Sequence, residues 1–187
     1  MDRSPDVINL SDFGRQLAIS AAQNPSLRFF IADELRLLEH AKVSKEHYHE
    51  ERVILVACAA AFSIRAYLEK SALSDGIWEG YATFWREYGE SSPERQVTFT
   101  RFGQRLPIYA FAATIDIEPI LRRSQPKDIP EIANEFAQIL ASNSANSDTG
   151  RKHCDLIAVK YALPIWNSQV TTTGESMKRA GLPIQER

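Results

Sequence analysis

The stretch VILVACAAAF, residues 53–62, is the longest apolar run in the sequence, and Ser63 and Arg65 interrupt the apolar pattern after it. The run is well short of the roughly 20 residues that span a bilayer, so we expect no membrane partner. Apolar residues lie nearly all round the helix that it would form, which is typical of a helix buried at the centre of a fold. Because a capping serine precedes the run, the sequence predicts a central helix from Ser44 to about Ser71.

Further amphipathic helices are predicted on both sides of this run. Before it, Asn24 and Pro25 form an N-cap followed by proline at the first helical position, and apolar residues continue to Ala41 at three- and four-residue spacing. After it, a turn at residues 74–76 leads into an aromatic helix that ends at Gly89. These patterns predict two helices that pack on the central one.

The C-terminal half contains more proline but keeps the helical spacing. Ser92 can start a helix by capping, and the spacing that follows favours helix over a short strand at residues 97–100, although those residues are β-branched and aromatic. Another helix is expected at residues 130–141. The last one is expected over residues 148–166, where Pro164 should kink or end it.

Together these elements predict one all-α domain. With 187 residues, 44% of them hydrophobic and 25% charged, the chain is long enough to bury a core without disulfides or a structural metal. We expect a helical bundle of about six to seven helices over residues 25–170, with an extended N-terminal arm at residues 1–24 and a C-terminal tail at residues 171–187. Cys58 and Cys154 lie in no disulfide or metal-finger spacing and no leader is visible, so a cytoplasmic or virion location is expected.

The histidines are the group of metal-binding side chains that the sequence brings closest together. His40, His47 and His49 lie among glutamates, and the spacing of Glu46 and His49 matches the Glu-x-x-His motif of di-iron helix bundles. That motif must occur twice, and the remaining histidine, His153, has no glutamate three residues before it. We therefore expect no metal site here and an ordinary solvated helix start.

Motifs of the common enzyme classes are absent from the sequence. It contains no glycine-rich phosphate loop, no nucleophile elbow and no paired-histidine zinc motif. No carboxylate stands isolated in an apolar run, where burial would raise its pKa for acid–base catalysis. The sequence thus predicts a protein that works by binding or assembly, without a cofactor, rather than an enzyme. An enzyme of unrecognised type is the third alternative, after an assembling protein and a protein that binds another protein.

Charge is distributed unevenly along the chain. The formal net charge of −2 argues against a protein that coats nucleic acid by bulk positive charge. Between residues 95 and 127, however, six basic residues accompany only two acidic ones, so that this segment has a net charge of +4. The six basic residues are Arg95, Arg101, Arg105, Arg122, Arg123 and Lys127.

Two interpretations of the basic residues stay open. Arg101 and Arg105 are four residues apart and would share one helix face, and Arg151, Lys152 and Lys160 form a second basic group. One interpretation is two solvated helix faces. The other is a shallow positive groove that follows a phosphate backbone, with aromatic side chains stacked on unpaired bases. Aromatic residues at helical spacing are usually core, and we expect most of them there.

Two segments near the end of the chain carry a family resemblance. RKHC at residues 151–154 and KYALPIWN at residues 160–167 resemble the Arg-x-x-Cys and Tyr-Ala-Pro-x-x-Trp-Asn signature of flexible filamentous plant-virus coat proteins, with a spacing that departs by about one helical turn. Residues 37–43 and 56–59 look like the two helices that open the core of those proteins. The stretch at residues 96–102 is similar instead to the coat bundle of rod-shaped viruses.

Both resemblances imply a coat protein that packages single-stranded RNA. The filamentous family implies Arg151 as a phosphate contact, whereas Arg101, Arg105 and Lys160 are candidates from charge alone. In that family a Phe-Asp-Phe-Phe block and a basic arm follow the Trp-Asn pair, and residues 168–187 contain neither. We therefore expect a self-assembling coat or nucleocapsid-like protein that binds single-stranded RNA by contacting the backbone of the RNA. The alternative is a cellular helical-bundle adaptor or regulator that binds another protein.

Overall fold

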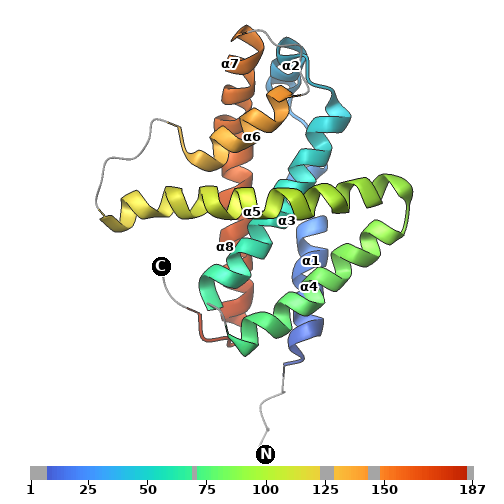
Figure 1. The fold of residues 1–187 in the computed structure, drawn as a ribbon, viewed down its shortest axis with the longest axis vertical. Helices are drawn as coiled ribbons and strands as arrows, with labels where there is room; N and C mark the ends of the chain where they lie inside the picture. The colour runs from blue at the N-terminus through green and yellow to red at the C-terminus, as the bar shows by residue number, and fades with distance from the viewer. Residues whose placement is uncertain (1–7, 69–70, 123–128, 143–147, 185–187) are drawn as a thin grey trace, which may run out of the picture.

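The computed structural model describes residues 8–68, 71–122, 129–142 and 148–184, and these ranges contain helices and no strand (Figure 1). The all-α prediction is confirmed. In chain order the elements are α1 (Leu10–Ala22), the 3-10 turn η1 (Pro25–Leu27), α2 (Ala32–Ala41), α3 (Lys45–Leu68), α4 (Ala72–Glu90), α5 (Pro93–Arg122), α6 (Glu131–Ser142), α7 (Asp148–Ile157), a π-helical turn (Ala158–Ala162) and α8 (Leu163–Arg179).

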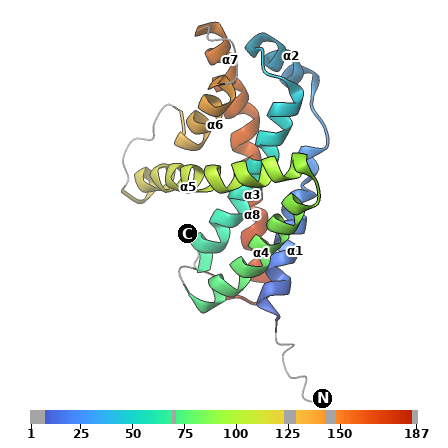
Figure 2. The same cartoon turned by 45° about the vertical axis from the view of Figure 1, so that its right-hand side comes forward.

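Helix α3 lies at the centre of the bundle. Every side chain from Ile54 to Ala61 is buried, and α3 packs against α1, α4, α5, α6 and α8. Figures 1 and 2 show α3 and α8 side by side along the long axis of the molecule, with α5 crossing them. None of the helices in the described ranges combines the length and the apolarity that a membrane span requires.

Most of the aromatic side chains form core, as the sequence predicts, whereas Phe29 and Phe111 are exposed. Trp85, Phe102, Tyr109 and Trp166 are buried, and Tyr81 donates a hydrogen bond to the backbone carbonyl of Ala57 in α3 at 2.6 Å. The partly buried members of the set pack against this core, and they are Trp78, Phe84 and Phe99. The fully buried rings are therefore unavailable for stacking on bases.

Most predicted helix starts are confirmed. Ser44 accepts a hydrogen bond from the backbone N–H of His47 at 3.2 Å, and Ser92 accepts one from Arg95 at 3.3 Å. The turn expected at residues 74–76 lies inside α4 instead, because Ser71 caps that helix three residues earlier. Residues 97–100 are helical, within α5.

The helix predicted from Asn24 to Ala41 is broken at residues 28–31. Asn24 caps the η1 turn as expected, but the guanidinium of Arg52 from α3 then binds the backbone carbonyls of Ser26 and Phe29. A continuous helix would need those carbonyls for its own hydrogen bonds. The buried arginine thus ends one turn, and α2 begins afresh after it.

Pro164 neither ends nor sharply interrupts the last helix. Proline usually breaks a helix, because it has no N–H to donate and its ring clashes with the carbonyl four residues earlier. Here the π-helical turn just before Pro164 widens the helix and accommodates the ring. Beyond it, the expected C-terminal tail is helical as far as Arg179, with Thr173, Gly174 and Met177 buried. Gly174 lies directly under the ring of Tyr67, so that α8 packs closely on α3.

The expected N-terminal arm also belongs to the bundle over residues 10–22, where it forms α1. Two glycines allow α1 and α4 to pack with their backbones in contact. A Cβ atom on Gly14 would lie 1.9 Å from the carbonyl oxygen of Ile77, and one on Gly80 would lie 1.8 Å from that of Ser11. A helical pattern of polar and apolar residues alone does not reveal such a contact, because glycine adds nothing to the pattern.

We predict that Gly14→Ala and Gly80→Ala each lower the free energy of unfolding by about 3 kcal/mol, because the two backbones must move apart. Gly103→Ala is the matched control. It lies in the middle of α5 with nothing within 4 Å of the added methyl group, and it should raise stability by about 1 kcal/mol. Urea unfolding of the three variants tests both signs, and equal effects at the three glycines would contradict the close packing of α1 on α4.

Candidate functional site

Arg101 and Arg105, the first pair of predicted RNA contacts, share one face of α5 as expected. That face is directed at the central helix. The guanidinium of Arg101 is paired with the carboxylate of Glu50, and Nη2 of Arg105 lies 3.6 Å from Oε1 of Glu51. The charge of both arginines is therefore already balanced by acids of α3.

Arg151, the residue implied by the family resemblance, is held within the α6–α7 contact. Its Nε donates a hydrogen bond to Oδ1 of Asp155, one turn along α7, at 3.0 Å. Its Nη2 donates a second one to Oδ1 of Asn134 in α6 at 3.2 Å. Since 38% of its side chain stays exposed, solvent still reaches the guanidinium.

Lys160 lies in the π-helical turn and faces the start of α2. Its Nζ is 2.5 Å from Oδ2 of Asp33, and the hydroxyl of Tyr161 donates to the same oxygen at 2.7 Å. These two hydrogen bonds hold the pKa of Asp33 below its ordinary value. The same contact raises the pKa of Lys160, which is the most exposed of the four candidates at 59%.

The four candidates are directed at three different helices. Arg101 and Arg105 face α3, Arg151 faces α6 and Lys160 faces α2. Each has an acidic partner, so a phosphate would have to compete with a carboxylate at every position. Two further basic residues of the predicted positive segment, Arg123 and Lys127, lie outside the described residues.

The histidines do not converge. The rings of His40 and His153 lie 5.2 Å apart between α2 and α7, whereas His47 faces Arg101 and His49 lies edge-on to Phe30. Within the described ranges no group of three or more histidine, cysteine, aspartate or glutamate side chains could hold a metal ion.

A buried charged pair lies between α3 and α5 that the sequence analysis did not identify. Glu51 is completely buried, and burial raises the pKa of its carboxyl, which the charge of Arg105 partly offsets. Neither carboxylate oxygen has a hydrogen-bond donor, and the buried hydroxyl of Tyr109 likewise has none among the described residues. The signal was present in the sequence, because Glu51 precedes the buried Leu55 by one helical turn and Cys58 by two.

This pair is a structural feature rather than a reaction site. Glu51, Tyr109 and Cys58 are all completely buried, so no substrate reaches the carboxyl in this conformation. A carboxylate with a raised pKa is typical of acid–base catalysts, but such a group must also touch the reacting atoms. What the pair does is hold α5 across the central helix.

The outer face of α5, which points away from α3, is uncharged over about five helical turns. We use this name for the exposed residues between positions 96 and 114, which are Gln96, Val97, Thr100, Gly103, Gln104, Pro107, Phe111 and Thr114. The side chain of Phe111 is 69% exposed. A solvated helix face normally carries charged residues, whereas the centre of a protein interface is depleted of them and enriched in aromatic residues.

No protein-family model matches this chain, and neither the curated proteins nor the solved structures include a match to it. The resemblance to virus coat proteins thus stays a prediction from the segments quoted above.

We predict that Arg105→Met lowers the free energy of unfolding by about 3 kcal/mol at pH 8, because it leaves the charge of Glu51 buried without a counter-ion. The loss should shrink towards pH 5. Burial raises the pKa of Glu51, so its contribution to stability is present below the ordinary pKa of a glutamate and is lost as the pH rises through the raised value. Removing Arg105 raises that pKa further. Urea unfolding at the two pH values measures the difference.

The double variant Glu51→Leu/Arg105→Met is the control for this prediction. It removes both charges and keeps an apolar contact, so it should recover most of the loss at pH 8 and should show little dependence on pH. A single variant that loses the same stability at pH 5 and pH 8 would contradict the pairing.

Proposed function

We propose that this protein works by self-association and that the outer face of α5 forms the interface. The observation that carries the proposal is a long, exposed and uncharged helix face with an aromatic residue on it. Two charged residues in the middle of the same helix, Arg101 and Arg105, are directed inward at α3, which is the reverse of an ordinary surface helix, and the exposed Glu94 and Arg95 lie before this face, in the first turn. Desolvation of this face in an interface would therefore leave no charge unpaired.

The spacing on the outer face favours another helix as the occupant. Val97, Thr100, Gln104, Pro107, Phe111 and Thr114 alternate at intervals of three and four residues. This is the repeat of a coiled-coil seam, in which side chains of one helix enter holes between side chains of the other. Gly103 leaves open space beside the seam, where a bulky side chain of the partner helix can approach closely.

A second copy of α5 fits this face in the antiparallel direction. Around a two-fold axis between Arg105 and Leu106, Val97 would lie opposite Thr114 of the second copy, Thr100 opposite its Phe111 and Gln104 opposite its Pro107. The seam is thus complementary to itself, as a symmetric dimer requires. The large ring of Phe111 would face the small residues Thr100 and Gly103.

We predict that Phe111→Glu raises the dissociation constant of the assembled form about tenfold or more, because it places a charge in the seam and removes its largest side chain. Phe29→Glu is the matched control, since Phe29 is 77% exposed and lies outside α5. Sedimentation equilibrium over a concentration series measures both constants. A wild-type chain that stays monomeric at every concentration contradicts the proposal and favours a helix of another protein as the occupant.

RNA binding is retained as a second candidate function because three of the basic side chains stay within reach of solvent. Arg101, Arg151 and Lys160 each keep at least a third of the side chain exposed beside their acidic partners. An assembly that repeats these positions along a polymer would bind a phosphate backbone without reading its sequence. RNA can bind at these positions only where its phosphate displaces the paired carboxylate, because the two anions compete for the same basic side chain.

We predict that Glu50→Gln tightens the binding of a single-stranded oligouridylate severalfold, since it frees Arg101, and that Arg101→Gln weakens it. Glu90→Gln is the matched control, as it changes the net charge equally at an exposed glutamate without an ion pair in the described part of the chain. Fluorescence anisotropy at two salt concentrations gives the affinities. Equal affinities for the Glu50 and Glu90 variants would exclude Arg101 as an RNA contact.

A further inference from the structure

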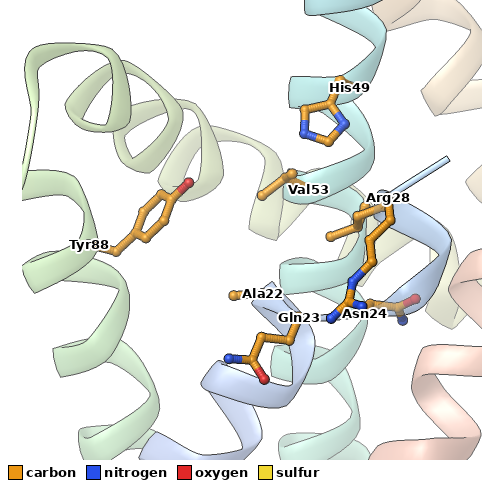
Figure 3. A pocket seen from close by; sticks show the side chains of 8 residues that line it. Ala22, Gln23, Asn24, Arg28, His49, Val53 and Tyr88 are labelled. Carbon is orange, nitrogen blue, oxygen red and sulfur yellow. The ribbon is translucent and has the colours of Figure 1, made fainter.

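A cavity of about 230 Å³ lies where the end of α1, the η1 turn, α3 and α4 meet (Figure 3). It is separate from the outer face of α5, since no residue of α5 lines it. In Figure 3, Tyr88 approaches it from α4, His49 and Val53 lie along α3, and Arg28 and Asn24 approach from the opposite side. The volume is below the roughly 300 Å³ of the smallest typical drug-sized sites, so the space suits a small ligand of about one ring with one polar group.

The lining of this cavity carries positive charge without a compensating acid. Arg28 is the cation, and its guanidinium makes no hydrogen bond and no ion pair in the part of the chain that the structure describes. No carboxylate is among the lining residues. A second arginine, Arg95, lies 4.7 Å above the ring of Tyr88. Because an unpaired guanidinium in a recess attracts an anion, the recess favours a negatively charged ligand.

Neutral donors and an apolar wall complete the recess. The amide of Gln23 and the hydroxyl of Tyr88 have no side-chain hydrogen-bond partner among the described residues, so both can donate to a ligand. Leu27 and Val53 provide apolar contact beside the ring of Tyr88. A ligand that fits this lining has an anionic group at one end and a small apolar body at the other.

The recess is built before any ligand arrives. Asn24 Oδ1 accepts a hydrogen bond from the backbone N–H of Ser26 at 2.9 Å, and its Nδ2 donates to Oε1 of Gln169 in α8 at 2.8 Å. These two bonds fix the turn that carries Arg28. The buried Arg52 holds the next residues of the same segment through the carbonyls of Ser26 and Phe29. Little conformational entropy is then lost when a ligand binds.

We propose that this cavity is a binding site for a small organic anion, in which Arg28 pairs with a carboxylate or phosphate group and the apolar body lies against Val53 and Tyr88. The proposal is independent of self-association through α5. The two sources of negative charge are distinguished by their probes, which are benzoate and phenyl phosphate. Inorganic phosphate tests whether the apolar body is required, and benzyl alcohol tests whether the charge is required.

The test is a titration of the ¹⁵N-labelled full chain with each probe, followed by NMR, which locates the binding as well as measuring it. Benzoate or phenyl phosphate should shift the amide signals of residues 22–24, 26–28 and 88, and benzyl alcohol should bind at least about tenfold more weakly. Arg28→Gln should weaken the binding of the anion about tenfold or more. Arg36→Gln, at an exposed arginine of α2 that does not line the cavity, should leave it within about twofold.

Three results would overturn the proposal. One is the absence of any shift with both anions at millimolar concentration, and another is equal affinity of the Arg28 and Arg36 variants. The third is binding of benzyl alcohol as tight as that of benzoate. Since Arg28 and Arg36 are both exposed, neither change is expected to unfold the chain, and the dispersion of the NMR spectra verifies this directly.

Discussion

Helix α3 is enclosed by α1, α4, α5, α6 and α8, and its burial determines how the other helices are arranged. The charged groups that such a helix brings into the core are stabilised by partners from the surrounding helices. Its N-terminal part brings three charged residues, Glu50, Glu51 and Arg52, immediately before the apolar run. Each of them meets an oppositely charged residue from another helix: Arg101 and Arg105 from α5, and Glu34 from α2.

These ion pairs account for the orientation of α5. The two arginines that meet the acids of α3 lie on its inner side, so the side that faces solvent is left with uncharged residues. The positive segment noted in the sequence and the uncharged outer face are therefore two sides of one helix. This coupling makes assembly through α5 better supported by the geometry than capture of RNA by the same arginines.

The pairing of a buried charge of α3 also determines the backbone conformation around the cavity. Arg52 reaches out of α3 to the carbonyls of residues 26 and 29 while it pairs with Glu34, and the chain between η1 and α2 therefore leaves the helical hydrogen-bonding pattern. Arg28 lies at this break, so its side chain does not belong to the face of a regular helix. The buried charge of Arg52 thus holds the segment that places the unpaired guanidinium of Arg28 across the recess from Tyr88.

Local sequence signals were enough to predict the central helix, the caps at Ser44 and Ser92, the start of η1 at Asn24 and the helical state of residues 97–100. Each depends on neighbours within about one or two helical turns, which periodicity and capping report. Contacts between distant parts of the chain determine which side of α5 is buried, where Arg52 breaks the helix before α2, how closely Gly14 and Gly80 bring α1 to α4, and which acid pairs with each candidate arginine. Those outcomes depend on residues distant in sequence, because a charge pattern records how many charges a segment carries and does not record what lies opposite them once the chain is folded.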